Sequence, residues 1–352
     1  MTNSAIDRES LRDLIRRLPR VRLAELPTPL GEYPRLAQAA GIGSLLVKRD
    51  DLSGLALGGN KTRLLEFIIG DALNTGCDVL VAGGGAEQSN HAVQCVAAAN
   101  RVGMDAVVVL QQRPDARSNG NALLHEVLGG RTVWVGGDPT IADRTSSACH
   151  MQHEADLLRE SGRTPYVLES SLHPLSVVAY LNAAIELCDQ FDALGVAPRR
   201  IYVTSEGSAL GGLTLGKHLL GLAWDVVGLD WRPLQPSTLD TLASVVLAAS
   251  RLLGIADRTE GIDYLLRPSG EPAYGVGRSS SWSAMKLAAQ MEGLLLDPVY
   301  TAKGFAGMLD HLRECPLDND DTVAFVHTGG LGAIFAYEAE IRRKIVNPLV
   351  AT

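Results

Sequence analysis

Short β-branched runs alternate with longer segments of helical periodicity along most of the chain. The pattern predicts strands at 45–49, 78–84, 105–110 and 131–136, and helices near 61–74, 89–102 and 118–128. Successive strands lie about 25 to 33 residues apart, which matches βαβ units. Such units pair their strands in parallel through right-handed crossovers.

The second half of the chain repeats this alternation. It predicts strands at 199–205, 224–231 and 321–328, and helices near 211–222, 236–254, 280–291 and from about 332. Glycine, proline and polar residues interrupt the pattern near 160–175, which indicates a boundary there. We therefore expect an α/β fold with two open, mostly parallel sheets flanked by helices. Ligands of such sheets bind beyond the carboxyl ends of the strands, so the informative residues should follow strands.

Composition and charge narrow the class of protein. The 352 residues are 46% hydrophobic and 20% charged, which is typical of a globular protein of about two domains. The formal net charge of −8 provides no basic surface, so neither nucleic acid nor an anionic membrane is an expected partner. The chain has no long apolar run, and its charged N-terminal segment lacks the features of a secretory signal. We expect a cytoplasmic protein.

The five cysteines are scattered, without a CxxC pair, and fit a reducing compartment. The segment Cys149-His150-x-x-His153 has some likeness to a metal site. It continues into EADLLRE, however, and is better interpreted as the surface of a helix, because no third ligand group is evident. No metal is expected.

Lys61 has a distinctive setting among the six lysines. It follows the turn Gly58-Gly59-Asn60 and stands in the first turn of the predicted helix 61–74. A lysine is disfavoured there because a helix N-terminus carries partial positive charge. The same field, with partial burial, would favour the neutral amine that Schiff-base chemistry needs. An ordinary solvated helix lysine is the alternative.

Two glycine-rich segments follow predicted strands and suit anions. Residues 83–91 (GGGAEQSNH) would present free N–H groups at a helix start to a carboxylate, with Ser89 and Asn90 as capping residues; a simple capping turn is the alternative. Residues 204–212 (TSEGSALGG) are similar to a phosphate cradle but are neither a Walker A loop nor GxGxxG. Glu206 is discordant there, because a carboxylate facing a phosphate would repel it.

Polar residues near the C-terminal end add support. Tyr274 lies in PAYG, Tyr300 lies in LDPVYT, and His327-Thr328-Gly329-Gly330 ends the last predicted strand. Each is weak alone, since a buried tyrosine is more often structural than catalytic. Together, as polar residues near strand ends in one α/β chain, they add some weight to a site at this edge.

These segments together resemble the family of D-cysteine desulfhydrases and 1-aminocyclopropane-1-carboxylate deaminases. The resemblance lies in LGGNKTRLLEF, EQSNHAVQCVAAANRVGM, EGLLLDPVYTAKG and VAFVHTGG, and runs in order from about Leu26 to about Tyr337. It implies pyridoxal 5'-phosphate as cofactor and the fold-type II architecture of the tryptophan-synthase β-subunit. It further implies a homodimer, and a smaller domain at 60–165 inserted into a larger one formed by 1–59 and 166–352.

The resemblance also implies roles for individual residues. Lys61 matches the lysine that binds the cofactor covalently, Asn90 the residue beside its phenolic oxygen, and Thr328 the residue at its pyridine nitrogen. Lys61, Ser89, Tyr274 and Tyr300 are the expected catalytic residues, and Ser89, Asn90 and His91 are expected to bind substrate. The expected cofactor-binding residues are Asn60, Lys61, Asn90, Ser205, Gly207, Ser208, Ala209, Leu210, Gly211 and Thr328.

Two departures from the family pattern bear on the reaction. The family's Gly-Ser-Gly-Gly-Thr type of phosphate loop is replaced by Ser-Glu-Gly-Ser-Ala, which lacks the threonine hydroxyl and adds Glu206. Thr301 stands where the deaminase subgroup carries a glutamate after the tyrosine. This second change argues against opening of a cyclopropane ring and favours the desulfhydrase side.

We therefore expect a lyase that performs α,β-elimination on a small amino acid. A D-cysteine-like substrate is favoured, giving pyruvate, ammonia and sulfide. A deaminase, a cysteate sulfo-lyase, a racemase or a β-replacement enzyme with the same cofactor are alternatives. A non-catalytic binding protein of this fold is a further alternative, motivated by Glu206. A nucleotide-dependent dehydrogenase is disfavoured, because no strand is followed by GxGxxG and a later acid.

Overall fold

The computed structural model describes residues 5–111, 118–136, 144–231, 238–268, 270 and 272–346. Its strands are β1 Leu30–Glu32, β2 Ser44–Lys48, β3 Val79–Ala86, β4 Asp105–Gln111, β5 Arg131–Val135, β6 Pro165–Leu168, β7 Arg200–Val203, β8 Asp225–Asp230, β9 Leu265–Pro268 and β10 Thr322–Val326. Its α-helices are α1 Arg8–Arg16, α2 Pro34–Ala40, α3 Lys61–Asn74, α4 Asn90–Val102, α5 Asn121–Val127, α6 Arg144–Glu160, α7 Pro174–Leu194, α8 Ser208–Leu220, α9 Thr238–Leu252, α10 Ser279–Glu292, α11 Thr301–Glu314 and α12 Glu338–Ile341.

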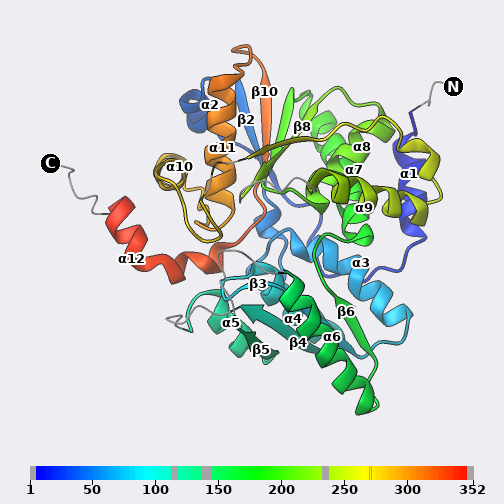
Figure 1. Ribbon diagram of the computed structural model, residues 1–352. Coiled ribbons are helices and arrows are strands. Elements are labelled where there is room, and N and C mark those ends of the chain that lie inside the picture. The colour runs from blue at the N-terminus through cyan, green and yellow to red at the C-terminus, as the bar shows by residue number, and fades with distance from the viewer. Residues whose placement is uncertain are drawn as a thin grey trace.

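These strands form two sheets, which confirms the predicted α/β class (Figure 1). The larger sheet has the order β1-β2-β10-β7-β8-β9 and is parallel except for the antiparallel edge pair β1–β2. The smaller sheet has the order β5-β4-β3-β6 and is parallel throughout. Because the smaller sheet is built from residues 79–168, the chain leaves the larger sheet after β2 and returns to it at β7. The domain division at 60–165 stays a prediction.

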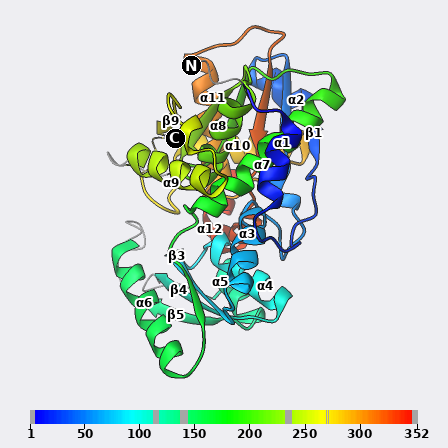
Figure 2. The same ribbon diagram turned by 90° about the vertical axis from the view of Figure 1, so that its right-hand side faces the viewer.

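Helices cover both faces of the larger sheet (Figures 1 and 2). Side chains along β2 alternate between the two faces of the sheet. Leu45 and Val47 lie in a hydrophobic cluster with residues of α2, α10 and α11, whereas Leu46 lies in a second cluster with residues of α7 and α8. In the smaller sheet, Val79 and Val81 pack against Met151 of α6. Two-sided burial explains the nearly continuous apolar runs of these strands.

Several elements differ from the sequence prediction. The strands β1, β6 and β9 were not predicted; they have only three or four residues each. Helix α8 begins at Ser208 rather than near 211, so Gly211 and Gly212 are helical. A Cβ atom on Gly212 would lie 2.4 Å from the Val177 carbonyl oxygen, so this glycine permits close packing of α8 on α7.

The single helix predicted from about residue 332 is replaced by shorter helical segments. Residues 331–337 form a 3-10 helix, followed by the short α12 and a π-helical turn at 342–346. Gly332 packs against Asn121 at the start of α5, where a Cβ atom would lie 2.2 Å from Oδ1. The 3-10 helix therefore packs closely against α5 at Gly332.

The surface interpretation of the cysteine–histidine segment is confirmed, since Cys149, His150 and His153 are exposed on α6. Across the described ranges, no group of three or more His, Cys, Asp or Glu side chains is placed to hold a metal ion. Within the same ranges, none of the helices combines the length and apolarity needed to cross a membrane.

Candidate functional site

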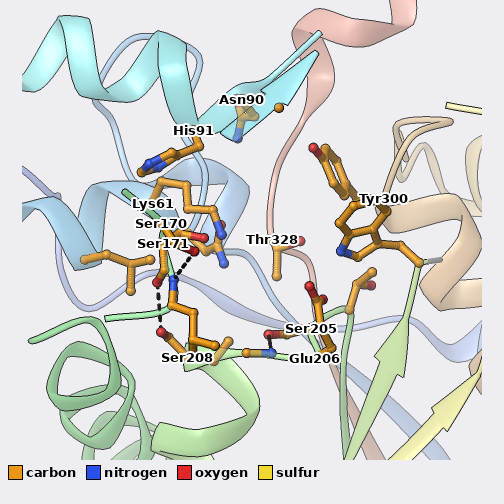
Figure 3. A pocket seen from close by; sticks show the side chains of 18 of the residues that line it. Lys61, Asn90, His91, Ser170, Ser171, Ser205, Glu206, Ser208, Tyr300 and Thr328 are labelled. Carbon is orange, nitrogen blue, oxygen red and sulfur yellow. Dashed lines mark hydrogen bonds between the residues drawn. The ribbon is translucent and has the colours of Figure 1, made fainter. Parts of the chain in front are cut away.

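A cavity of about 310 Å³ lies between the two sheets, at the carboxyl ends of their strands (Figure 3). This volume falls at the lower end of the usual range for small-molecule sites, about 300–1,000 Å³. Most of the residues singled out from the sequence line it. They are Asn60, Lys61, Ser89, Asn90, His91, Ser205, Gly207, Ser208, Ala209, Tyr274, Tyr300 and Thr328.

Lys61 is half-buried at the first position of α3, directly after the turn 58–60. Its side chain lines the cavity. The Asn60 N–H donates to the Thr328 carbonyl oxygen across 2.9 Å, which ties this turn to the end of β10. Gly59 has a φ of +127°, and a Cβ atom there would lie 2.6 Å from Asn90 Nδ2. The lysine turn, the start of α4 and the end of β10 therefore meet at Gly59.

The N-terminus of α4 forms a second side of the cavity. Ser89 is the N-cap, and its Oγ accepts a hydrogen bond from the Ala92 N–H at 3.2 Å, as the sequence predicts. Ser89 and Asn90 are both buried. The first N–H groups of an α-helix have no partner within the helix, so this end of α4 is suited to an anion such as a substrate carboxylate.

His91 contributes a neutral ring at this end. Burial, reinforced by the nearby charge of Lys61, lowers the pKa of His91 to about 3. The ring also packs on Cys95, whose Sγ lies 3.6 Å from Nε2. Any attraction for a carboxylate here therefore comes from the helix N-terminus and from polar groups, not from an imidazolium.

The turn between β7 and α8 forms the third side. The Ser205 Oγ accepts from the Gly207 N–H at 3.0 Å, and the Ser208 Oγ donates to the Ser171 carbonyl oxygen at 2.8 Å. Ser208 therefore offers its backbone N–H rather than its hydroxyl. The remaining first-turn N–H groups of α8 stay suited to a phosphate.

Two of the expected cofactor-binding residues lie elsewhere. Leu210 and Gly211 are absent from the cavity lining and are buried within α8. The Gly211 N–H donates to the Gly207 carbonyl oxygen at 2.9 Å, and a Cβ atom on Gly211 would lie 2.9 Å from the Leu242 and Val246 side chains. Both residues therefore lie in the packed body of α8, which begins earlier than predicted, and their assignment to the cofactor stays a prediction.

Glu206 does not share the orientation of the serines around it. Its side chain lies on the side of Tyr300, whereas Ser208 lies on the opposite side of the cavity (Figure 3). Its charge is also among the causes that raise the pKa of Tyr300, after burial. The Glu206 side chain therefore lies away from the side of the cavity that Ser208 forms.

Tyr300 and Tyr274 form a pair of hydroxyl groups on this side. The Tyr300 hydroxyl donates to the Tyr274 hydroxyl across 3.2 Å. Burial raises the pKa of both phenols above their ordinary value. Tyr300 raises the pKa of Tyr274 further, whereas the hydrogen bond with Tyr274 partly offsets the rise for Tyr300. Both groups hold their protons at neutral pH and are available as proton donors.

Several lining residues were missed by the sequence reasoning. They are Glu169, Ser170, Ser171 and Leu172 after β6, Trp231 after β8, and Thr238 and Thr241 of α9. The rule that ligands lie beyond strand ends would have pointed to 169–172 if β6 had been recognised. The same rule applies to Trp231, which was the last residue of the predicted strand 224–231 and directly follows the observed strand β8.

Comparisons with known proteins agree with this geometry. The family described as "Pyridoxal-phosphate dependent enzyme" matches residues 21–329. A D-cysteine desulfhydrase of Klebsiella pneumoniae subsp. pneumoniae is 34% identical over 347 residues, covering 94% of this chain and 100% of that protein. A solved structure of an ACC deaminase homologue has a TM-score of 0.85 at 30% identity, covering 95% of this chain and 99% of the other. A threonine deaminase of Solanum lycopersicum shares the fold, with a TM-score of 0.64 at 15% identity over 94% of this chain and 86% of the other.

The chain belongs to the family of pyridoxal-phosphate-dependent enzymes. The resemblance to desulfhydrases and deaminases, the fold-type II architecture and the cofactor expected from the sequence are thereby confirmed.

The cavity's own groups fit pyridoxal 5'-phosphate. Lys61 offers the primary amine that reacts with an aldehyde. The N-terminus of α8 and the Ser205 hydroxyl suit the phosphate, and Asn90 and Thr328 offer polar groups to the edge of a ring. The cavity thus provides for each chemical part of this cofactor.

Proposed function

We propose that this enzyme catalyses α,β-elimination on a small amino acid that carries a leaving group on Cβ. D-cysteine is the favoured candidate, and the products are pyruvate, ammonia and sulfide. One observation carries the proposal: an amine, on Lys61, and a protonated phenol, on Tyr300, line the same cavity from different sides (Figure 3). Elimination needs such a base at Cα and such an acid at the leaving group.

Each part of the site has a place in this reaction. The N-terminus of α4 holds the substrate carboxylate through its N–H groups, and neutral His91 adds no competing charge. When bound, the cofactor supplies an electron sink for the charge that develops at Cα. Lys61 or Ser89 takes the Cα proton. The Cβ–S bond breaks with its electron pair on sulfur, and the Tyr300 hydroxyl protonates the thiolate. Water then hydrolyses the unsaturated amine that is released to pyruvate and ammonia.

The first experiment compares Lys61→Ala with Lys217→Ala. Lys217 is a matched control because it pairs with Asp225 at 3.2 Å on the surface of α8. Wild type and Lys217→Ala should be yellow and should release pyruvate, whereas Lys61→Ala should release none. A colourless wild type that cannot be reconstituted with cofactor, or pyruvate release by Lys61→Ala, would contradict the proposal.

A screen of substrates separates the neighbouring reactions. Both enantiomers of cysteine, cysteate and 1-aminocyclopropane-1-carboxylate are tested for pyruvate, sulfide, sulfite and inverted stereochemistry. Sulfide from D-cysteine supports the proposal, and sulfite from cysteate or 2-oxobutanoate from the cyclopropane substrate points to a related enzyme. Visible absorbance without turnover of any amino acid supports a binding protein instead.

We also propose that the enzyme acts as a homodimer in the cytoplasm, as the family resemblance implies. Phe335 is 72% exposed, and the adjoining α12 projects from the body of the molecule (Figure 1). All five cysteines are free, which suits a reducing compartment. Sedimentation should give twice the chain mass of 37.5 kDa, and Phe335→Ser should lower the dimer fraction. A monomer at all concentrations contradicts the homodimer.

A further inference from the structure

Asp297 is a fully buried carboxylate that lies three residues before Tyr300 and outside the lining of the cavity. The Val299 and Tyr300 N–H groups donate to its Oδ2 atom at 2.8 and 2.9 Å. The Thr301 N–H and the Thr301 hydroxyl donate to its Oδ1 atom at 2.8 and 2.7 Å. Because all four groups are donors, they suit an ionised carboxylate, which only accepts hydrogen bonds.

Residues 297–301, here called the tyrosine turn, are also bonded in the reverse direction. The Asp297 N–H donates to the Thr301 Oγ1 atom at 2.8 Å, so the two ends of the turn hold each other. Tyr300 lies inside this turn, and its backbone angles, φ −127° and ψ −67°, are not those of an α-helix. The turn, rather than the helix α11 that follows it, therefore sets the direction in which the Tyr300 ring leaves the backbone.

The segment that leads into the tyrosine turn is attached to the end of β10. His327 Nδ1 accepts a hydrogen bond from the Gly329 N–H at 3.2 Å, which assigns the ring proton to Nε2. This Nε2–H donates to the Leu295 carbonyl oxygen at 2.7 Å. A Cβ atom on Gly330 would lie 2.6 Å from Asp297 Cγ, so the carboxylate packs directly on the backbone after β10. The tyrosine turn is thereby fixed relative to the residues expected beside the cofactor ring.

The phenol that this turn carries lines the cavity on the side across from Lys61 (Figure 3). Its hydroxyl donates to the Tyr274 hydroxyl at 3.2 Å. Burial raises the pKa of Tyr300, the hydrogen bond with Tyr274 partly offsets that rise, and the charge of Asp297 adds to it. Asp297 therefore holds the backbone of Tyr300 and also favours the protonated form of its phenol.

We propose that Asp297 is a positioning residue for the proton donor Tyr300. The inference rests on the proposed elimination, in which the Tyr300 hydroxyl protonates the departing thiolate. Asp297 touches no reacting atom; its carboxylate holds the tyrosine turn so that the phenol stays within reach of the leaving group. Loss of the carboxylate should slow a reaction whose leaving group needs a proton. It should spare a reaction whose leaving group departs as a stable anion.

The test compares pyruvate release by the holoenzyme from D-cysteine and from β-chloro-D-alanine, whose chloride departs without a proton. Asp297→Asn keeps the size of the side chain, but its NH2 group faces two of the four donors whichever way the amide is turned. The kcat for D-cysteine should fall by about tenfold to 100-fold, the cost of misplacing a reacting group by about 1 Å. The kcat for β-chloro-D-alanine should change by no more than about twofold.

A matched control separates this effect from the loss of a cap. Asp7 caps α1 in a similar way, accepting from the Ser10 N–H at 2.9 Å and from the Ser10 hydroxyl at 2.6 Å, and lies outside the cavity lining. Asp7→Asn should leave kcat for both substrates unchanged.

A double variant tests whether Asp297 acts through the phenol. Asp297→Asn combined with Tyr300→Phe should be slower on D-cysteine than Tyr300→Phe alone by no more than about twofold. Should Asp297→Asn fail to fold, Thr301→Val decides, because it keeps the carboxylate and removes one of its four donors. It should lower kcat for D-cysteine by about threefold or more, the contribution of one hydrogen bond, and spare β-chloro-D-alanine.

Failure of this inference differs from failure of the proposed function. An unchanged kcat for D-cysteine in Asp297→Asn, or an equal loss on the two substrates, overturns the positioning role and leaves the elimination standing. A double variant that is slower than Tyr300→Phe by the full factor of Asp297→Asn overturns it as well. A wild type that releases pyruvate from neither substrate contradicts the proposed function itself.

Discussion

Gly59 and Gly329 pack backbone to backbone, so that a Cβ atom on Gly329 would lie 2.6 Å from the Gly59 Cα atom. Both glycines have positive φ values, +127° and +98°, which other residues rarely adopt. This contact places the turn that precedes Lys61 beside the segment that follows β10 and contains Thr328. The position of the reactive amine therefore depends on two residues without side chains.

We predict that Gly59→Ala abolishes cofactor binding. The added methyl group would lie 2.4 Å from Gln94 Nε2 and 2.6 Å from Asn90 Nδ2, so the lysine turn or α4 must shift. The measurement is visible absorbance after reconstitution. Gly136→Ala is the control, because its Cβ atom would meet nothing within 4 Å. Normal absorbance in Gly59→Ala would show that the contact is not needed.

Tyr300→Phe should lower kcat for D-cysteine by about 10²–10⁴-fold, the usual contribution of a positioned proton donor. Tyr274→Phe removes only the acceptor of the Tyr300 hydroxyl and should cost less. Pyruvate release at saturating substrate measures both effects. Tyr202→Phe is the control, since that hydroxyl meets His311 Nδ1 at 3.0 Å away from the cavity. Wild-type kcat in Tyr300→Phe would remove Tyr300 from the mechanism.

The sequence predicted the lysine helix well because its signals are local. The apolar periodicity and the preceding Gly-Gly-Asn turn define α3 at 61–74, as observed. The Ser89 cap was likewise readable, because capping depends on residue type at a helix start.

The sequence could not predict features that depend on distant packing. The four residues of β6 form a strand because they pair with β3, so the stretch appeared as a break and the lining residues 169–172 were missed. The early start of α8 follows from its packing on α7, which needs Gly212. The direction of Glu206 depends on the path of one turn, and local residue types do not determine it.

Arg63 should be a large contributor to stability close to the active lysine. Its buried guanidinium binds Asp50 at 2.8 Å and Glu186 at 2.7 Å, and the latter carboxylate also binds Lys48. Burial alone would raise the pKa of Glu186, but the hydrogen bonds and charge of Arg63, with the charge of Lys48, lower it to about 2.

Arg63→Met leaves these two carboxylates without their main partner and should reduce the free energy of unfolding by about 3–5 kcal/mol. Urea unfolding followed by circular dichroism measures the change. Arg16→Met is the control, because Arg16 pairs with Glu9 and Asp13 on the surface and should cost less than about 1 kcal/mol. Equal losses in the two variants would contradict the role of the buried network.

His125 should make the protein less stable in mild acid. Burial lowers the pKa of His125 to about 4, below the value near 6.5 that it regains on unfolding. Between these values the unfolded chain binds a proton that the folded chain does not, so stability is lost as the pH falls from 6.5 towards 4. The slope is about 1.4 kcal/mol per pH unit for this histidine.

His125→Phe should lower the slope of stability against pH by about 1.4 kcal/mol per pH unit, the value for one proton. His153→Asn on the surface of α6 should leave the slope unchanged. The measurement is the free energy of unfolding in urea at several pH values between 4 and 7. An unchanged slope in His125→Phe would show that this side chain is not the source of the acid sensitivity.

The most direct test of the account is the identity of the lysine that binds the cofactor. Holoenzyme is reduced with borohydride, digested and analysed by mass spectrometry, which locates the phosphopyridoxyl group on a peptide. We predict a single modification, on Lys61. Modification of another lysine, such as Lys303 or Lys217, or no modification in a fully reconstituted protein, would contradict it.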